Sequence, residues 1–412
     1  MPTMNSLTKD QASSIFVKVV ETCEKKLYDP KLNGVDWRRI AETRRERILA
    51  AANEAEFERE FNDLIRELRV SHAGFYHERR PRAAGKMAIS ATLFKARDDG
   101  RDCWAFQDVH PGGAAFKAGI VPGDVLLRVG EIDIVPPELP LFPLGEAMPV
   151  DICRRDGSRM RVTVTIPKSK TKERPLIELQ PVSFVKEGSV GWLKVCMFPG
   201  AIGMDVARDI DRAIESLNCE QLVIDLRGNT GGGIGCLRLM SYLTGARVPV
   251  GYSVTRRRAE QTFSKSDLPV FDHIPSKKIG LLGLALKFIG RDHSVAIATE
   301  GLGKQRFHGK VVILVNEHSA SSCEMVAAFA SENRLAAIVG TATPGRLLGG
   351  HSFRVGHGYR IAIPVAAYYT WNGTFLEGKG VAPDVEEPFS VAAIRSGTDA
   401  PLQRAMNVAK TL

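Results

Sequence analysis

The chain has 412 residues, of which 44% are hydrophobic and 25% charged, and its formal net charge is +9. This length exceeds one ordinary core and predicts several domains, and the apolar content argues against large-scale disorder. The seven cysteines are odd in number and include no C-x-x-C pair, which argues against a disulfide framework and against a zinc site.

The positive charge does not indicate a nucleic-acid partner. Basic residues are dispersed, and the short runs at Lys168–Arg174 and Arg256–Arg258 are typical of a solvated linker and a loop. No apolar run approaches the length of about 18 residues that a membrane span needs. The first residues lack a basic n-region and an apolar h-region, so we expect a cytoplasmic location unless a leader has been removed.

Residues 1–83 have helical apolar spacing, for example at Ile15, Val19 and Cys23, and we expect an N-terminal helical region. Helical periodicity stops near Ser71 and His72. His72 is therefore a candidate catalytic base just beyond a helix, although a lone histidine is more often structural or exposed.

Residues 84–168 indicate a small β-rich module. The segment from Pro111 to Asp124 follows the pattern P-x-x-A-x-x-x-A-G-I-x-x-G-D and resembles a PDZ domain, which binds an extended peptide as an added strand. The expected carboxylate loop falls at Met87, Ala88 and Ile89, which we predict to be peptide-binding. No Gly-hydrophobic-Gly run stands there, so a spacer or lid is the alternative. Polar residues 169–174 are interpreted as a linker.

Residues 175–412 alternate strand and helix patterns, which predicts an α/β core. A strand at Val190–Phe198 and a helix at Ala201–Leu217 are followed by a buried strand at Leu222–Leu226. This strand leads into a glycine-rich run that ends at Gly233. Such a run brings backbone N–H groups close to an oxyanion, but it is also compatible with a phosphate loop or a flexible turn.

The most informative segment is a β-branched run, Val311–Val315, followed by a short break and an apolar helix. Three hydroxyl residues stand at the junction: Ser319, Ser321 and Ser322. A helix N-terminus carries unpaired N–H groups and partial positive charge, so a serine there is a candidate nucleophile. The alternative is that these serines only cap the helix.

Together the PDZ pattern, the D-L-R-G-N-T-G-G-G run and the N-E-H-S-A-S-S-C-E segment resemble the C-terminal-processing (tail-specific) serine proteases. A closing element at Gly373–Asp384, with the pattern G-x-x-x-E-G-x-G-V-x-P-D, agrees. The resemblance implies a multidomain α/β (α+β) chain. Its parts are an N-terminal helical region, a PDZ domain, and a ClpP/crotonase-like catalytic core with a C-terminal helix over 175–412.

That family has a Ser–Lys version, with lysine 25 residues beyond the nucleophile, and a version similar to the tricorn core protease. Counting from Ser321 gives Arg346, and a guanidinium cannot serve as a general base. The tricorn-like version uses serine, histidine, a second serine and glutamate, which correspond here to Ser321, His72, Ser71 and Glu377. The resemblance implies that Glu377 acts through Ser71.

The expected oxyanion donors are backbone N–H groups of Ser322 and of Gly231 or Gly232. Cys323 is a rival nucleophile and His318 a rival base; we favour a buried structural thiol for Cys323. The sequence thus predicts a serine endopeptidase or tail-processing protease with protein or peptide substrates and neither metal nor organic cofactor. The alternative is an inactive PDZ-bearing scaffold or a small-lipid (retinoid-type) carrier on the same core.

Overall fold

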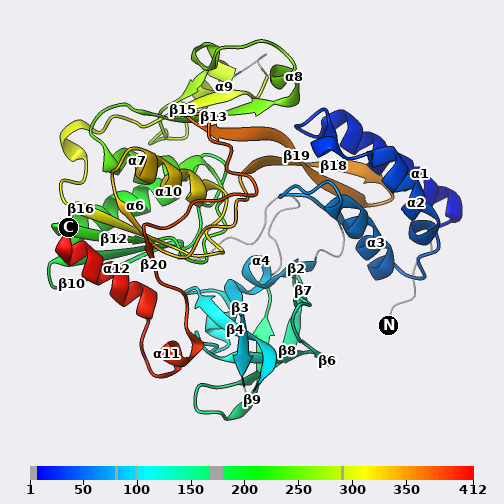
Figure 1. Cartoon of the computed structure of the whole chain (residues 1–412), viewed down its shortest axis with the longest axis horizontal. Coiled ribbons are helices and arrows are strands. Elements are labelled where there is room, and N and C mark those ends of the chain that lie inside the picture. The colour runs from blue at the N-terminus through cyan, green and yellow to red at the C-terminus, as the bar shows by residue number, and fades with distance from the viewer. Residues whose placement is uncertain (1–6, 79–81, 99, 168–179, 289–291) are drawn as a thin grey trace.

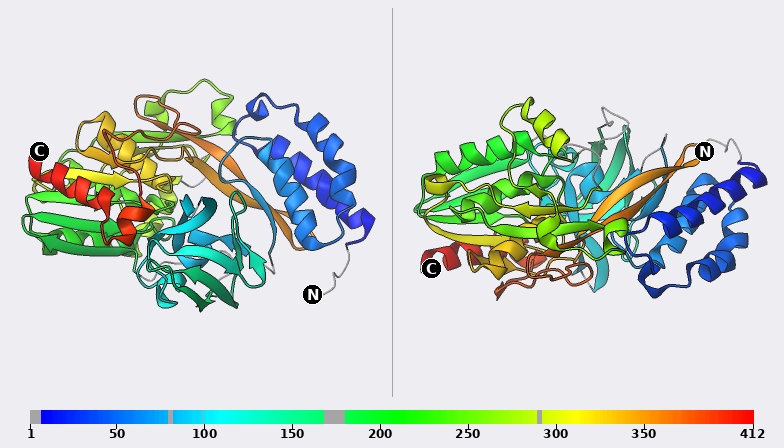
Figure 2. Two further views of the ribbon diagram at one scale, coloured as in Figure 1. Left: turned by 60° about the horizontal axis from the view of Figure 1, so that its bottom comes forward. Right: turned by 90° about the horizontal axis from the view of Figure 1, so that it is seen from above.

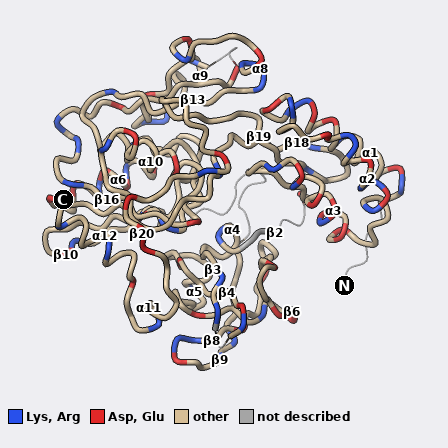
Figure 3. Tube along the Cα trace, in the orientation of Figure 1, with Lys and Arg blue, Asp and Glu red and all other residues tan. Residues whose placement is uncertain are grey.

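The computed structural model describes residues 7–78, 82–98, 100–167, 180–288 and 292–412. Figure 1 shows three parts: N-terminal helices on one side, a layered α/β core on the other, and a small β-rich part below them. We call the last part, residues 82–167, the β module. Acidic and basic residues are interspersed along all three parts (Figure 3). The predicted linker at 169–174 lies outside the described residues.

Three helices form the N-terminal region, and a polar side chain caps the start of each. They are α1 (Lys9–Lys26), α2 (Trp37–Leu49) and α3 (Glu54–Arg66), with a 3-10 turn, η1 (Leu32–Gly34), between the first two. The caps are Thr8, Asp36 and Asn53, whose side chains accept backbone N–H groups of the first turns. The apolar faces of the helices share one core with Phe75 and Tyr359.

Those two aromatic residues belong to a second sheet that ties the helices to the core. Its strand order is β1-β19-β13-β15-β14, and β18 pairs with β19. The strands are β1 (Gly74–His77), β13 (Pro249–Thr255), β14 (Val270–Phe271), β15 (Val295–Ala298), β18 (Leu348–Gly356) and β19 (Tyr359–Thr370). In Figure 2, β18 and β19 leave the core and run along the helices. The chain that follows α3 joins the same sheet through β1, which pairs with β19.

The β module has its own sheet and its own apolar core. The sheet order is β3-β4-β5-β8-β9, with β6 on β5, while β2 pairs separately with β7. The elements are β2 (Arg82–Ala84), α4 (Gly85–Ile89), β3 (Ala91–Asp98), β4 (Arg101–Val109), α5 (Ala114–Lys117), β5 (Val125–Val129), β6 (Ile132–Asp133), β7 (Leu141–Pro143), β8 (Ala147–Cys153) and β9 (Arg159–Thr165). Phe106 and Phe142 are fully buried within it.

The α/β core is a sheet in the order β10-β11-β12-β16-β17-β20, parallel except for β10. Its strands are β10 (Val182–Glu187), β11 (Val190–Val195), β12 (Gln221–Asp225), β16 (Lys310–Val315), β17 (Ala337–Gly340) and β20 (Val385–Glu386). Central strands of a parallel sheet are covered on both faces, which explains the continuous apolar run in β16.

Helices cover the two faces of this sheet, as Figure 2 shows. One face packs against α6 (Met204–Leu217), α7 (Leu237–Leu243) and α10 (Ser322–Glu332), and the other against α12 (Ala400–Thr411). The remaining elements are η2 (Ile234–Cys236), α8 (Arg256–Ala259), η3 (Lys265–Asp267), α9 (Gly280–Phe288), η4 (Gly303–Gln305) and α11 (Val391–Arg395).

The predicted class, a mixed α/β chain with N-terminal helices, is confirmed. Some predicted boundaries were wrong. The strand expected to end at Phe198 ends at Val195, and the helix expected from Ala201 begins at Met204, because Gly203 stands in the left-handed region with φ of 70°. None of the described helices is long and apolar enough to cross a bilayer.

Candidate active site

Ser321 stands in a sharp turn between β16 and α10. The strand ends at Val315 and the helix begins at Ser322, so Ser321 is the residue before the helix. Its φ of 58° and ψ of −121° are rare for a residue with a side chain, and such strain collects at functional sites. The turn leaves Ser321 partly exposed while its neighbours are buried. This is the geometry expected of a nucleophile.

The turn is held by the carboxylate of Glu324, a residue to which the sequence analysis gave no role. Glu324 accepts the backbone N–H groups of Ser321 (3.0 Å), Gly345 (2.7 Å) and Arg346 (2.8 Å), and the hydroxyl of Thr343 (2.8 Å). Burial raises the pKa of Glu324, and the hydroxyl and the three N–H groups oppose that shift. The S-x-x-E spacing of Ser321 and Glu324, typical of a capping box, is the signal that could have identified it.

The glycine run lies directly against the nucleophile. A Cβ atom at Gly231 would stand 2.6 Å from Cβ of Ser321 and 3.0 Å from N of Ser322, so only glycine fits. The N–H of Gly231 donates to Oδ1 of Asn229 at 2.8 Å. Among the hydrogen bonds of the described residues, none uses the N–H of Gly232 or of Ser322. Of the predicted donors, these two are thus the ones available to an oxyanion.

The rival side chains of this segment have structural partners. Ser319 is fully buried and donates to the carbonyl oxygen of Leu226 at 2.9 Å. Cys323 is also buried, and burial raises the pKa of its thiol, which donates to the carbonyl oxygen of Asn229. Nε2 of His318 lies 3.1 Å from the carbonyl oxygen of Leu93 in the β module. These contacts favour Ser321 as the nucleophile.

His72, Ser71 and Glu377 form one hydrogen-bonded chain. Oγ of Ser71 lies 2.8 Å from Nδ1 of His72 and donates to Oε2 of Glu377 at 3.0 Å. Oε1 of Glu377 accepts the backbone N–H of Ser71 at 2.7 Å. Residues more than three hundred positions apart are thus brought together, as the resemblance implied.

This chain of contacts determines the tautomer of His72. An ionised carboxylate can only accept, so the single hydroxyl proton of Ser71 points to Glu377. Oγ of Ser71 must then accept a proton from Nδ1 of His72, which leaves Nε2 of the neutral ring unprotonated. Nε2 is therefore the atom that can take a proton from a nucleophile.

The surroundings of His72 favour its neutral form. Desolvation of the ring lowers the pKa of His72; the Glu377 carboxylate raises it, and the Arg346 guanidinium lowers it. The net direction is downward, so the neutral base persists at lower pH than for an ordinary histidine. Like Ser321, His72 has a positive φ, here 57°.

A short segment joins the two halves of the site. The N–H groups of Gly345 and Arg346 donate to Glu324 beside the nucleophile. The N–H of the next residue, Leu347, donates to Oε2 of Glu377 at 2.9 Å. No hydrogen bond between Ser321 and His72 is present among the described residues. The two halves are linked instead because consecutive backbone N–H groups just before β18 donate to Glu324 and to Glu377.

Arg346 stands where the Ser–Lys version carries its base. Its side chain is exposed, and it contributes its backbone N–H to Glu324 and its charge to the field at His72. The described residues contain no group of three or more His, Cys, Asp or Glu side chains arranged to hold a metal ion.

The residues predicted to bind peptide form helix α4 rather than an open loop. Ala88 and Ile89 are buried in the core of the β module, and only Met87 is partly exposed. A peptide at this place would contact Met87 or backbone rather than the other two side chains. Their peptide-binding role stays a prediction.

Two family models match the chain. Peptidase family S41 matches residues 189–387, and the tricorn protease C1 domain matches residues 9–68. The first includes the nucleophile turn, the glycine run and Glu377, and the second covers the N-terminal helices. Residues 189–387 of this chain thus form a peptidase family S41 region.

Curated relatives agree with this assignment. The carboxyl-terminal-processing protease of Synechocystis sp. PCC 6803 is 25% identical over 317 residues, which cover 72% of this chain and 62% of the relative. Carboxyl-terminal-processing peptidase 2 of Arabidopsis thaliana is 26% identical over 291 residues, 68% of this chain and 49% of the relative. The putative tricorn protease homolog 2 of Streptomyces coelicolor is 25% identical over 388 residues, 87% of this chain and 29% of the relative. The chain thus spans about half to three fifths of the length of the processing proteases.

Solved structures share the fold. The photosystem II D1 C-terminal processing protease matches with a TM-score of 0.54 and 18% identity, covering 96% of this chain and 99% of that one. Mature CPAF in complex with lactacystin matches with a TM-score of 0.62 and 16% identity, covering 98% of both chains. At these identities the likeness establishes the architecture alone.

Proposed function

We propose that this chain is a serine endopeptidase or tail-processing protease that hydrolyses protein or peptide substrates through an acyl-enzyme on Ser321. The observation that carries the proposal is the hydrogen-bonded chain Glu377–Ser71–His72, which leaves Nε2 of His72 free as a base. The S41 match and the names of the relatives support the same chemistry.

In the first step Oγ of Ser321 forms a bond to the carbonyl carbon of the substrate while its proton passes to Nε2 of His72. The negative charge on the carbonyl oxygen is stabilised by the N–H groups of Gly232 and Ser322. The C–N bond then breaks, and the amine leaves with the proton from His72. A water molecule, deprotonated by the same nitrogen, attacks the ester and releases the acid and Ser321.

Ser71 and Glu377 are positioning residues in this scheme. As His72 becomes positively charged, its Nδ1–H donates to Ser71, whose hydroxyl donates to the carboxylate of Glu377. The negative charge thus stabilises the imidazolium through one intervening hydroxyl. Arg346 opposes the same charge and cannot replace the base.

A fluorophosphonate probe tests the proposal directly. We expect covalent labelling of the full chain, mapped by mass spectrometry to Ser321, and no labelling of Ser321→Ala. Ser322→Ala is the matched control, because its buried hydroxyl has no partner among the described residues. Absence of labelling in the folded parent chain would instead favour an inactive scaffold or a carrier of small lipids.

We further propose that the β module is a PDZ domain that binds an extended peptide. The Pro111–Asp124 pattern supports this, as does the position of β3 at the edge of the module's sheet, where a strand can be added. Fluorescence anisotropy with a labelled peptide from a substrate's C-terminus should report binding to the Ser321→Ala chain. Binding that is unchanged when the free carboxylate is amidated would restrict the proposal to internal strands.

A further inference from the structure

We infer that Asp108 of the β module is a positioning residue for the oxyanion donors, which it orients through the side chain of Asn316. The inference rests on the proposed function. By this inference, a side chain of the β module helps to arrange the active site.

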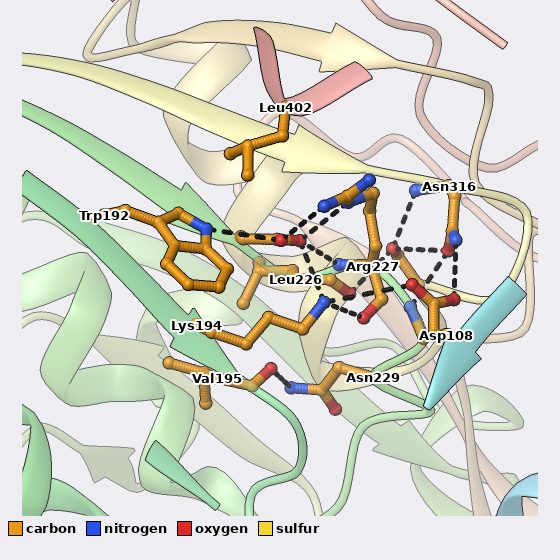
Figure 4. Close-up of polar contacts among 12 residues, drawn as sticks. Asp108, Trp192, Lys194, Val195, Leu226, Arg227, Asn229, Asn316 and Leu402 are labelled. Carbon is orange, nitrogen blue, oxygen red and sulfur yellow. Dashed lines mark hydrogen bonds and ion pairs between the residues drawn. The ribbon is translucent and has the colours of Figure 1, made fainter. Parts of the chain in front are cut away.

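Asp108 joins the β module to the polar interior of the core. It lies near the end of β4 and is 7% exposed. Its Oδ2 accepts the hydroxyl of Thr92 at 2.7 Å within the module, and the side-chain amide of Asn316 at 3.0 Å from the core. Figure 4 shows Asp108 and Asn316 facing each other at the edge of a buried polar cluster.

Asn316 connects the two loops of the proposed oxyanion site. Its Oδ1 accepts the N–H of Gly228, which opens the glycine run, and the N–H of His318, in the nucleophile turn, each at 3.1 Å. Its own backbone N–H donates to Oγ of Ser319 at 2.9 Å. One amide side chain therefore sets the distance between the run that carries Gly232 and the turn that carries Ser321.

The carboxylate of Asp108 holds the NH2 end of that amide in place. A carboxylate only accepts, so the NH2 group of Asn316 must face Asp108. Its oxygen is then directed at the two loop N–H groups. Without Asp108, the two loop N–H donors would still favour this orientation, but the NH2 group would lose its acceptor and the amide would be held at its oxygen end alone.

The contact also leaves no room for the glycine run to shift toward the module. Gly228 has φ of 69°, and a Cβ atom there would stand 2.8 Å from the side chain of Asp108. The run is fixed at its other side by the N–H of Ala320, which donates to the carbonyl oxygen of Asn229 at 3.0 Å. A movement of Asp108 is thus transmitted to backbone next to the nucleophile.

Buried cations keep Asp108 ionised. Nζ of Lys194 lies 3.9 Å from Oδ1 of Asp108 and 3.1 Å from Asp225, and Arg227 pairs with Asp225 and Asp399 (Figure 4). Burial alone would raise the pKa of Asp108, but Lys194 and Arg227 lower it below the usual range. The acceptor that orients Asn316 is therefore a charged one.

Other contacts would keep the module in place when this one is removed. They include His318 on the carbonyl oxygen of Leu93 (3.1 Å), the ring pair Phe94–Phe389 (centroids 5.3 Å apart) and Arg395 on the carbonyl oxygen of Gly123 (3.4 Å). A substitution of Asp108 should consequently change the orientation of Asn316 without releasing the module.

The test compares Asp108→Ala and Asp108→Asn in the full chain, using a fluorophosphonate and separating the maximal labelling rate constant from probe affinity. The fraction labelled reports how much protein is folded, whereas the rate constant reports how well the oxyanion site is arranged. We expect Asp108→Ala to lower the rate constant about tenfold or more, with little change in probe affinity. Asp108→Asn, which keeps an acceptor oxygen, should recover part of the loss.

Asp124→Asn is the matched control. Asp124 is also a buried aspartate of the β module, paired with Arg154 at 2.8 Å within the module. Its labelling rate constant should stay within about twofold of the parent value. Equal rate constants for Asp108→Ala and the parent, or an equal loss in Asp124→Asn, would overturn the inference while the proposed function stands.

The outcomes remain distinct in two further cases. If the parent chain is not labelled at all, the proposed function fails and the inference fails with it. If Asp108→Ala does not fold, Thr92→Val decides, because it keeps the carboxylate of Asp108 and removes only its two hydrogen bonds with the Thr92 hydroxyl, one to the carboxylate and one from the backbone N–H. A rate constant for Thr92→Val that equals the parent's would then contradict the inference, and a severalfold loss would support it.

Discussion

The nucleophile half and the base half of the site are held in different ways. Ser321 lies at a junction of the central sheet, and the Glu324 carboxylate behind it accepts four donors. His72 lies on a connection between α3 and β1, and it is oriented through Ser71 and Glu377, both of which are only partly buried. The nucleophile half is therefore fixed by folding of the core, whereas the base half depends on a few hydrogen bonds between partly exposed side chains.

The largest effect is expected at Ser321. Ser321→Ala should change the thermal unfolding curve little, since it removes a single hydroxyl from a partly exposed position. It should lower turnover of a peptide substrate on the order of 10⁴- to 10⁶-fold, because the nucleophile cannot be replaced. Retained turnover would show that the nucleophile half has been assigned to the wrong residue.

His72→Ala should come close to the same loss, because nucleophile and base act as a unit. His318→Ala serves as the control; that ring contacts the β module, and its removal should cost far less turnover. Steady-state hydrolysis by both variants at equal folded fraction decides the point. A larger defect in His318→Ala would move the base to the nucleophile turn.

The two supporting carboxylates should respond differently to amide replacement. Glu324→Gln places an NH2 group among four donors and should lower the free energy of unfolding by roughly 1.5–3 kcal/mol. Glu377→Gln should leave stability closer to the parent value but reduce kcat up to about 10²-fold through misplacement of His72. Chemical denaturation and kinetics on the two variants measure both effects. Equal losses of stability would remove the proposed contrast.

The smallest expected effect is a shift in pH dependence. Activity should fall at low pH as His72 becomes protonated, at a pH below the ordinary histidine pKa because desolvation lowers it. Arg346→Ala removes a charge that lowers the pKa of His72, so the acid limb of kcat/KM should move to higher pH. Lys379→Ala, at an exposed position, is the control. A shift to lower pH in Arg346→Ala would contradict the electrostatic account.

Much of this architecture could be predicted from the sequence. The apolar run Val311–Val315 and the glycine run define the central strands and their loops, because buried parallel strands and close backbone approaches require such residues. Ser71, His72 and Glu377 could be joined only through family resemblance, because no local pattern relates positions three hundred residues apart.

Other features could not be predicted, because they depend on side-chain orientation in space. The folded turns determine that Asn229 accepts the N–H of Gly231. They also determine that Glu324 is buried beneath four donors. The contact of Asp108 with Asn316 joins two parts of the chain whose docking has no sequence periodicity. The position of α4, which buries Ala88 and Ile89, is likewise a result of packing in the β module.

The central claim is that Glu377 acts on His72 through Ser71, and a double-mutant cycle on Ser321 acylation tests it most directly. The cycle compares fluorophosphonate labelling rates of the parent, Ser71→Ala, Glu377→Gln and the double variant. If the relay is real, Ser71→Ala disconnects the carboxylate, and adding Glu377→Gln should lower the rate by less than about twofold more. Losses that multiply in the double variant would mean that the two residues act independently, and would contradict the account.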